Sequence, residues 1–322
     1  NSLKVSEEEL KQAIAKVDRE FIQYMKEAKD NIIFYHEAQK KQGFELTKDN
    51  GVYLGQRIIP LQRVGVYVPG GRAAYPSSVL MNVLPARIAG VAEIIMVTPP
   101  NAEGGIDPYI AAAAEIAGVD QIYKVGGAQA VAALAYGTNS IPRVDKIIGP
   151  GNIYVATAKK LVYGQVDIDM IAGPSEILVI ADEQANPRYI AADLLSQAEH
   201  DPMASAILLT TSTELADAVT EQLQLQTARL SKQEIIKESL ANYGAIMVLD
   251  TLAECIELSN QLAPEHLELM VTEPKQYLDN IRNAGSIFLG YMTCESIGDY
   301  FGGTNHVLPT GGTARFYSAL NV

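Results

Sequence analysis

The chain has 322 residues, 48% of them apolar, with a formal net charge of −13 and a pI of about 4.8. This length predicts roughly two domains with ample core. The acidic balance repels phosphate backbones and offers no basic patch for membrane docking, so we expect neither nucleic acid nor a membrane as a partner. No apolar run is long enough for a membrane span, and residues 1–10 lack a signal-peptide segment. The sequence therefore indicates a soluble, cytoplasmic protein.

The two cysteines, Cys255 and Cys294, lie far apart and form no CxxC pattern. This usage indicates a reducing compartment and excludes a metal site built from thiolates. Cys255 falls on a predicted amphipathic helix, where a buried core thiol is the ordinary expectation. Cys294 lies close to Asp299 in sequence, so a place beside a site stays open for it. The sequence predicts neither cysteine as a nucleophile.

The N-terminal segment predicts one long helix. Ser6 and Glu9 have the spacing of a capping box, and apolar residues recur behind them at helical intervals. His36 falls within this helix, and we interpret it as structural. Asn50-Gly51 then marks a turn, with a hairpin around it.

From about residue 63, short β-rich runs alternate with glycine loops and alanine-rich helices. This alternation predicts βαβ units and parallel sheets. Ala172-Gly173-Pro174 separates two such blocks, and function is expected on strand-end loops that line a cleft between them. The predicted strands are 64–68, 94–98, 122–125, 146–148, 177–181, 206–210, 245–249, 267–271 and 286–289. The predicted helices include 128–136, one ending at 160, 189–200 and 251–262.

His200 closes the predicted helix 189–200, and Gln197 lies three residues earlier on the same face. An imidazole nitrogen and an amide oxygen in this arrangement can reach one metal ion. The alternative, which spacing alone favours, is a helix end stabilised by a histidine through the helix dipole. Asp299 would add a carboxylate oxygen, giving an O/N/O set suited to zinc or manganese. Water, substrate or another chain would then complete the coordination.

Glu265 and His266 are adjacent between a predicted amphipathic helix and an apolar strand. On a loop, neighbouring side chains alternate in direction, so the two can present different acid/base groups to one cavity. The alternative is a pair of ordinary solvated residues after the helix-ending Pro264. His306 lies in the glycine-rich segment 298–312, which is typical of a long loop that lines a site or of a flexible surface segment.

Glycine follows several predicted strands, as in Gly126-Gly127 and Gly149-Pro150-Gly151. A strand, a glycine turn and a helix N-terminus can together receive a pyrophosphate. The GxGxxG fingerprint of dinucleotide sites is absent, however, because Tyr154 stands where the third glycine would be. On the motif alone, nucleotide binding is only weakly indicated.

Together, these segments resemble histidinol dehydrogenase over nearly the whole chain. Seven collinear motifs are far more specific than any single one. They are Val66-Tyr67-Val68-Pro69-Gly70-Gly71, Val125-Gly126-Gly127-Ala128-Gln129-Ala130, Gly149-Pro150-Gly151-Asn152, Ala172-Gly173-Pro174-Ser175-Glu176, and segments 194–200, 263–267 and 302–312. The resemblance implies an NAD-dependent enzyme of histidine biosynthesis. It would oxidise L-histidinol through histidinal to L-histidine, a four-electron reaction that uses two NAD molecules in turn.

The resemblance also implies roles for individual residues. Glu265 and His266 would form the acid/base pair, with His266 accepting the alcohol proton and Glu265 activating water for the aldehyde stage. A zinc ion, one per subunit, would orient the amino and imidazole nitrogens of the substrate. Its ligands would be Gln197, His200 and Asp299. The NAD contacts would be Tyr67, Gln129 and Asn152. The substrate contacts would be Ser175, Gln197, His200, His266, Glu295, Asp299 and His306.

The fold implied is α/β, with two Rossmann-like βαβ domains, one inserted in the other, and a cleft between them. Residues 1–66 and 176–322 would form the first domain, and 67–175 the inserted, NAD-contacting domain. A homodimer is also implied. Family members extend beyond both ends of this chain, and their C-terminal extension supplies a further zinc-ligand histidine and a substrate-binding glutamate across the dimer interface. Two alternatives stay open: a relative that oxidises another amino or sulfonated alcohol, and a truncated, catalytically silent protein that binds NAD or substrate.

Overall fold

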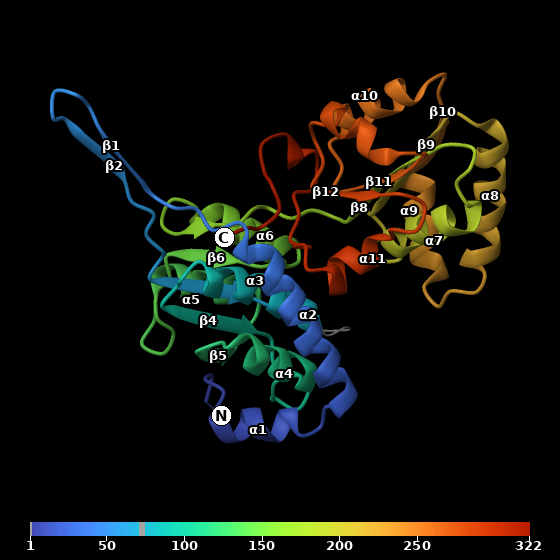
Figure 1. Cartoon of the computed structure of the whole chain (residues 1–322). Helices are drawn as coiled ribbons and strands as arrows, with labels where there is room; N and C mark the ends of the chain where they lie inside the picture. Colours follow the sequence, from blue (N-terminus) through green and yellow to red (C-terminus); the bar gives the residue numbers. More distant parts are fainter. Residues whose placement is uncertain (1, 71–74) are drawn as a thin grey trace. The chain divides into compact units, whose positions relative to one another are not determined.

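A computed structural model describes residues 2–70 and 75–322 (Figure 1), so Gly71 of the first glycine motif lies outside the described residues. The chain divides into two compact units: one of residues 1–170, 300–307 and 320–322, the other of 171–299 and 308–319. In the described residues, each unit holds a five-stranded parallel sheet, and the first also carries a hairpin. The predicted α/β class with two Rossmann-like sheets is therefore confirmed. Within the same ranges, no helix is both long and apolar enough to cross a membrane.

The N-terminal segment forms two helices, α1 (Glu7–Ile14) and α2 (Arg19–Glu37), where the sequence predicted one. Ser6 caps α1 by accepting the backbone N–H of Glu9, as expected. The Glu9 carboxylate itself pairs with Lys124 at 2.8 Å instead of turning back to complete the predicted capping box. Asp18 then accepts the backbone N–H of Phe21 and starts α2, because a side-chain acceptor at this position satisfies a free N–H of a new helix.

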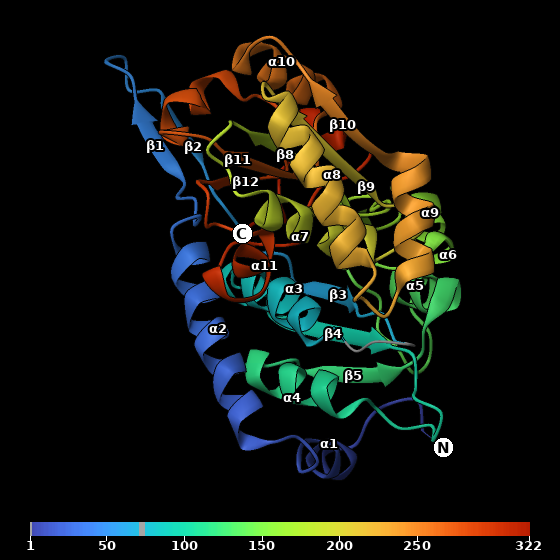
Figure 2. The same ribbon diagram turned by 90° about the vertical axis from the view of Figure 1, so that its right-hand side faces the viewer.

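The first unit's sheet has the strand order β5-β4-β3-β6-β7. Counted along the unit, this is 3-2-1-4-5, a doubly wound order with its switch point between β3 and β6. Successive strand residues face opposite sides, so one apolar core lies under α3 and α4 and another under α5 and α6 (Figure 2). The elements are β3 (Arg63–Tyr67), α3 (Pro76–Ile88), β4 (Glu93–Thr98), α4 (Pro108–Ala117), β5 (Gln121–Lys124), α5 (Gly127–Tyr136), β6 (Lys146–Ile148), α6 (Ile153–Val162) and β7 (Asp167–Ile168).

The predicted hairpin around Asn50-Gly51 is confirmed. β1 (Phe44–Thr47) pairs antiparallel with β2 (Tyr53–Gln56), and every residue of both strands is exposed. The hairpin projects away from the first sheet (Figure 1).

The second unit's sheet has the order β10-β9-β8-β11-β12, again 3-2-1-4-5 along its own chain. The apolar side chains of α7, α8 and α9 cover one face, and those of α10 cover the other. Thr251 and Glu254 form the predicted capping box at the start of α10. The elements are β8 (Glu176–Ala181), α7 (Pro187–Ala198), β9 (Ser205–Thr210), α8 (Thr213–Thr227), α9 (Gln233–Tyr243), β10 (Gly244–Val248), α10 (Leu252–Leu262), β11 (His266–Met270), η1 (Pro274–Asn280), β12 (Ser286–Leu289), α11 (Glu295–Ile297), η2 (Gly298–Gly302) and η3 (Thr313–Arg315).

The grouping of residues 1–66 differs from the predicted division, which joined them to 176–322. Met25, Ala28 and Ile32 of α2 belong to the same core as the strand residue Val64. β3 is itself the middle strand of the first sheet. Residues 1–66 therefore group with the first unit, because that is where their apolar faces are buried.

His36 is fully buried within the first unit, which supports its structural interpretation. Its Nδ1 lies 2.8 Å from the carbonyl oxygen of Ile32, and its Nε2 lies 3.2 Å from Nδ2 of Asn305. A carbonyl can only accept, so Nδ1 donates and Nε2 accepts. Asn305 also donates to the Met81 carbonyl at 2.8 Å, so this contact fastens segment 300–307 to α2 and α3. Desolvation lowers the pKa of His36.

This lowered pKa predicts a pH dependence of stability. Between the folded pKa and the ordinary value of 6.5, the unfolded chain binds more protons than the folded chain, so stability is lost as the pH falls through that window. We expect the free energy of unfolding to drop from about pH 7 to about pH 5, and to drop less in His36→Gln. Urea unfolding followed by circular dichroism measures this, and equal losses in both proteins would contradict it.

Candidate active site

The amino ends of β8 and β11 lie side by side, because Ile177 pairs with His266 in the parallel register. Glu176 therefore lies next to Glu265, and each carboxylate accepts the other residue's backbone N–H, at 2.9 and 3.3 Å. The second oxygen of Glu176 accepts the N–H of Gly311 at 2.8 Å. These bonds fix the start of both strands and of the segment around residue 311. The sequence analysis assigned no role to Glu176, although an acidic residue that opens an apolar strand was a visible signal.

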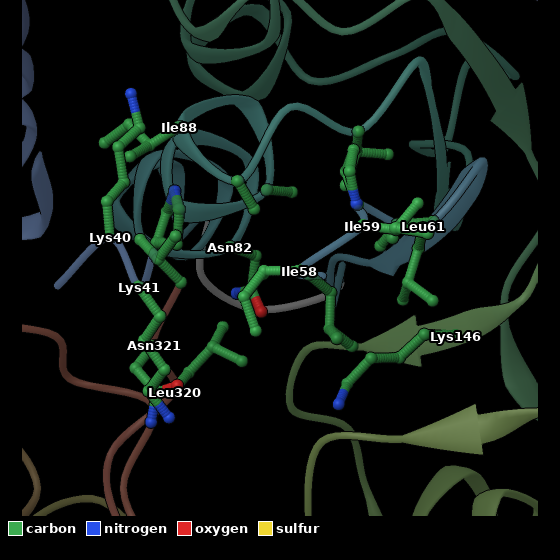
Figure 3. A pocket seen from close by; sticks show the side chains of 18 of the residues that line it. Lys40, Lys41, Ile58, Ile59, Leu61, Asn82, Ile88, Lys146, Leu320 and Asn321 are labelled. Atoms are coloured by element: carbon green, nitrogen blue, oxygen red, sulfur yellow. The ribbon is translucent and has the colours of Figure 1, made fainter. Parts of the chain in front are cut away.

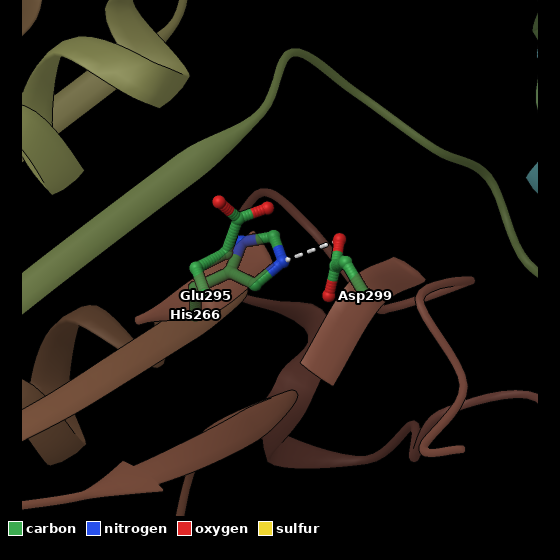
Figure 4. A group of neighbouring side chains, drawn as sticks. All are labelled: His266, Glu295 and Asp299. Carbon is green, nitrogen blue, oxygen red and sulfur yellow. Dashed lines mark ion pairs between the residues drawn. The ribbon is translucent and has the colours of Figure 1, made fainter. Parts of the chain in front are cut away.

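His266 is oriented by the same contact. Its Nδ1 lies 2.9 Å from the carbonyl oxygen of Glu176, so Nδ1 carries the hydrogen and Nε2 faces the other way. Nε2 lies 3.5 Å from Oδ2 of Asp299, as the dashed line in Figure 4 marks. The Glu265 carboxylate lies 3.6 Å from Nδ1. His266 begins a strand instead of lying on a loop, and both residues are buried, so the alternative of two ordinary solvated side chains is wrong.

His266, Glu295 and Asp299 converge on one point (Figure 4). Each offers a ligand atom, and these atoms lie within 4.8 Å of one another, so the three residues could hold a metal ion. Glu295 opens α11 and is held from two sides. Ser196 donates to its carboxylate at 3.2 Å, and the Glu268 carboxylate accepts its backbone N–H at 3.0 Å.

The protonation of this group is set by burial and by charge. Burial raises the pKa of Glu265 to about 7 and that of Glu295 to about 7. Burial alone lowers the pKa of His266, but the charge of Glu265 and the hydrogen bond and charge of Asp299 outweigh it and raise it to about 10. The site therefore keeps protons near neutral pH, as expected where acidic groups share a desolvated space.

A second carboxylate pair, which the sequence analysis missed, lies behind Glu295. Glu268 is 1% exposed, and the carboxylate of Asp193 in α7 acts on its pKa. Burial and the charge of Asp193 raise the pKa of Glu268 to about 9, so this pair holds a proton at neutral pH. The signal was an acidic residue in the middle of the apolar strand His266–Met270.

The predicted metal ligands Gln197 and His200 come from the end of α7. Gln197 is 2% exposed, and its carbonyl accepts the His200 N–H at 3.0 Å. Part of His200 is exposed, yet desolvation of its ring lowers its pKa, and Lys232 adds to this. The charges of His266 and Asp299 also act on His200, so the ring lies near both. Asp299 is thus common to the converging group and to the predicted ligand set.

The predicted NAD residues all lie in the first unit. Tyr67 ends β3, Asn152 caps α6 after the short turn that follows β6, and Gln129 lies exposed in the first turn of α5. β3 and β6 flank the switch point, where doubly wound sheets bind their ligands at the carboxyl ends of the strands. The Tyr67 hydroxyl accepts the N–H of Gly127 at 3.0 Å, linking the loops after β3 and β5.

Three further residues stand apart from this geometry. Ser175 precedes β8, and its carbonyl accepts the Ser205 N–H at 3.0 Å. His306 belongs to the first unit, with its ring centroid 6.2 Å from that of Tyr300, and its substrate role stays a prediction. Cys255 is a core thiol, as expected, and burial raises its pKa to about 11.

The first unit also has a pocket of about 550 Å³ with an apolar wall and the lysines Lys40, Lys41 and Lys146 (Figure 3). Within residues 2–70 and 75–322, its lining includes none of the predicted site residues. The chemistry proposed from the sequence therefore does not depend on this pocket.

Comparison with known proteins gives a consistent result. The family model for histidinol dehydrogenase matches residues 1–322. Histidinol dehydrogenase of Clostridium acetobutylicum is 59% identical over 321 residues, covering 100% of this chain and 74% of that protein. The Lactococcus lactis enzyme is 56% identical over 322 residues, covering 100% and 75%. The crystal structure of histidinol dehydrogenase from Elizabethkingia anophelis superposes with a TM-score of 0.97 at 44% identity, covering 100% of this chain and 74% of that one.

We expect Glu176→Ala to lower the free energy of unfolding by about 1.5–3 kcal/mol, because it leaves the N–H groups of Glu265 and Gly311 without their charged acceptor. Chemical denaturation measures the change. Glu183→Ala removes an exposed carboxylate just beyond the other end of β8 and serves as the matched control, with a change within about 0.5 kcal/mol. Equal effects of the two substitutions would refute a special role for the Glu176 contacts.

Proposed function

This chain belongs to the histidinol dehydrogenase family and is an NAD-dependent oxidoreductase, and from that premise we propose how its residues carry out the reaction. The substrate that this identity implies is L-histidinol, oxidised to L-histidine. Relatives at 56–59% identity carry the same name, so the alternatives of another alcohol or a silent binding protein are not favoured.

His266 is the proposed proton acceptor, and the observation that carries this is its bond to the Glu176 carbonyl. Because Nδ1 donates there, the neutral ring has its lone pair on Nε2, the atom that faces Asp299. In the first oxidation, Nε2 would take the hydroxyl proton of the alcohol, and NAD⁺, when bound, would supply the acceptor for the hydride of the carbinol carbon, so that alcohol and NAD⁺ become aldehyde and NADH. The negative charge of Asp299 helps to raise the pKa of His266. Once the Asp299 carboxylate coordinates a cation, the positive charge of that cation would offset it, and the pKa of His266 would fall.

Glu265 is the proposed base of the second stage. Its raised pKa, about 7, suits a group that exchanges protons with water near neutral pH. It would take a proton from the water that adds to the aldehyde carbon, and a second hydride would then leave the hydrate for NAD⁺. The backbone N–H of Glu176 holds this carboxylate in place at 2.9 Å.

We propose zinc as the resident metal, held by Asp299 with His200 and Gln197. Asp299 belongs to the group with His266 and Glu295 whose ligand atoms lie within 4.8 Å of one another, and its charge also acts on the His200 ring. Carboxylate, imidazole and amide-oxygen ligands suit a hard or borderline divalent cation. Bound there, zinc would fix the amino and imidazole nitrogens of the substrate and polarise its alcohol. We likewise propose that NAD lies at the switch point of the first sheet, against Tyr67, Gln129 and Asn152.

We also propose a cytoplasmic homodimer. The hairpin offers Phe44, Leu46 and Leu54 to solvent, with between 47% and 56% of each residue exposed. A two-stranded hairpin with bare apolar side chains is only marginally stable in water by itself, which favours a partner surface. Sedimentation of the chain at micromolar concentration gives its oligomeric state directly.

The role of His266 predicts that His266→Asn lowers kcat for NADH formation from histidinol by about 10²–10⁴-fold, because the alcohol loses its proton acceptor. Zinc content, measured by mass spectrometry of the metal, should stay at the wild-type level. Cys294→Ser, a nearby substitution outside the proposed machinery, is the control and should keep wild-type turnover. Undiminished turnover in His266→Asn would rule out His266 as the base.

The ligand role of His200 predicts that His200→Asn lowers zinc content after dialysis, since the site loses one protein ligand. His36→Gln removes a histidine from the other unit and should keep the wild-type zinc content. If both variants retained the same zinc as the wild type, His200 would not be a ligand.

A further inference from the structure

Lys159 of α6 and Asp169, which follows β7, form an ion pair whose side chains are only 3% and 1% exposed. The neighbouring pair Lys146–Asp167 joins β6 to β7 nearby, but its side chains are 28% and 50% exposed. Burying two charges costs desolvation free energy, and their mutual attraction need not offset that cost. The presence of a buried ion pair is therefore not explained by a gain in stability. The question is therefore what this pair holds.

Both members of the pair bind the same residue, Gly149. The Lys159 ammonium donates to the Gly149 carbonyl at 2.9 Å, and the Asp169 carboxylate accepts the Gly149 N–H at 2.7 Å. Every backbone polar atom of Gly149 is thus bound by a charged group. Asp169 also accepts the N–H of Met170 at 2.6 Å, which fixes the carboxylate itself.

Gly149 is the first residue of the turn that leads from β6 to Asn152 and α6. Its φ of +107° is a left-handed conformation, and a Cβ there would overlap the carbonyl oxygen of Tyr67. The turn therefore packs directly on the end of β3. At its far end, the Asn152 side chain accepts the N–H groups of Tyr154 and Val155 and starts the helix that carries Lys159. Lys159 therefore ties the start of the turn, Gly149, to the helix that follows the turn, and Gly149 packs against the carbonyl of Tyr67.

Lys159 is buried, and its ammonium binds Asp169 and the Gly149 carbonyl, so it acts on the turn and not on a cofactor directly. We propose that Lys159 and Asp169 are positioning residues that hold the Gly149–Asn152 turn in the conformation that receives NAD. This inference rests on the proposed NAD site at Tyr67, Gln129 and Asn152. It assigns the buried pair to cofactor affinity and gives it no part in metal binding or in histidinol binding.

The test uses the zinc-loaded full chain and four variants. Lys159→Met leaves Asp169 buried without its partner, so both stability and NAD affinity should fall. The double variant Lys159→Met/Asp169→Asn removes both charges and should recover much of the thermal stability. Lys146→Met breaks the exposed pair, and Lys160→Met removes the next lysine of α6, which is exposed.

We expect the double variant to raise the KM for NAD and the Kd for NAD by about tenfold, since a hydrogen bond from a charged group to the turn is lost. Its kcat at saturating NAD, its KM for histidinol and its zinc content should stay within about twofold of the wild type. Lys146→Met and Lys160→Met should leave the NAD constants within about twofold. Titration calorimetry with NAD⁺ gives the Kd without turnover.

Three outcomes would overturn the inference, and a fourth separates it from the proposed function. A double variant that regains stability together with wild-type NAD affinity would make the pair purely structural. An equal loss of affinity in Lys160→Met would mean that positive charge near the cofactor matters, not the hold on Gly149. If the wild type binds NAD but forms no NADH from histidinol, the proposed function fails while the affinity comparison still decides the role of the pair. A wild type that does not bind NAD removes the site, and the inference with it.

Discussion

The reciprocal contact between Glu176 and Glu265 is the constraint on which the site in the second unit depends. Each carboxylate accepts the other residue's backbone N–H, across the two strands at the switch point of the sheet. A one-residue slip of β11 against β8 would turn every side chain to the other face and separate the two acids. The same register places the Glu176 carbonyl against Nδ1 of His266, so strand pairing sets the direction in which the imidazole presents its free nitrogen.

Burial gives this site its acid/base character. Glu265, Glu268 and Glu295 each have a pKa raised by desolvation, to about 7, 9 and 7. Water would stabilise these carboxylates as anions, and the protein interior replaces it with a few fixed donors: backbone N–H groups, Ser196 and the His266 ring. Carboxyl groups with pKa values near neutral pH can exchange protons with a substrate. Their negative charge, once they are ionised, can be neutralised by a bound cation.

The two sheets share one strand order and carry their proposed site residues at opposite edges. In the first unit, Tyr67 and Asn152 lie at the carboxyl ends of the strands, where the helix N-termini suit a phosphate-containing cofactor. In the second, Glu176 and His266 lie at the amino ends of β8 and β11. α7 runs back from the carboxyl edge, as a crossover helix between parallel strands must, so its last turn returns Gln197 and His200 to the amino edge before β9 begins.

The sequence by itself determined the local structure and much of the chemistry. The pattern of β-branched and turn-forming residues predicted β6 and β12 with their exact bounds, and it predicted the hairpin at Asn50-Gly51. These features depend on residues that are neighbours in the chain. The family resemblance, carried by seven motifs, named the activity, while the acid/base roles that it implies for Glu265 and His266 stay proposals. Only the tertiary structure decided the rest, because it depends on which side chains meet across strands. Glu9 turned to Lys124, and residues 1–66 joined the first sheet through the apolar face of α2. Glu176, Glu268 and the Lys159–Asp169 pair acquire their roles from partners up to 135 residues away, as with Glu176 and Gly311, and no local pattern encodes such contacts.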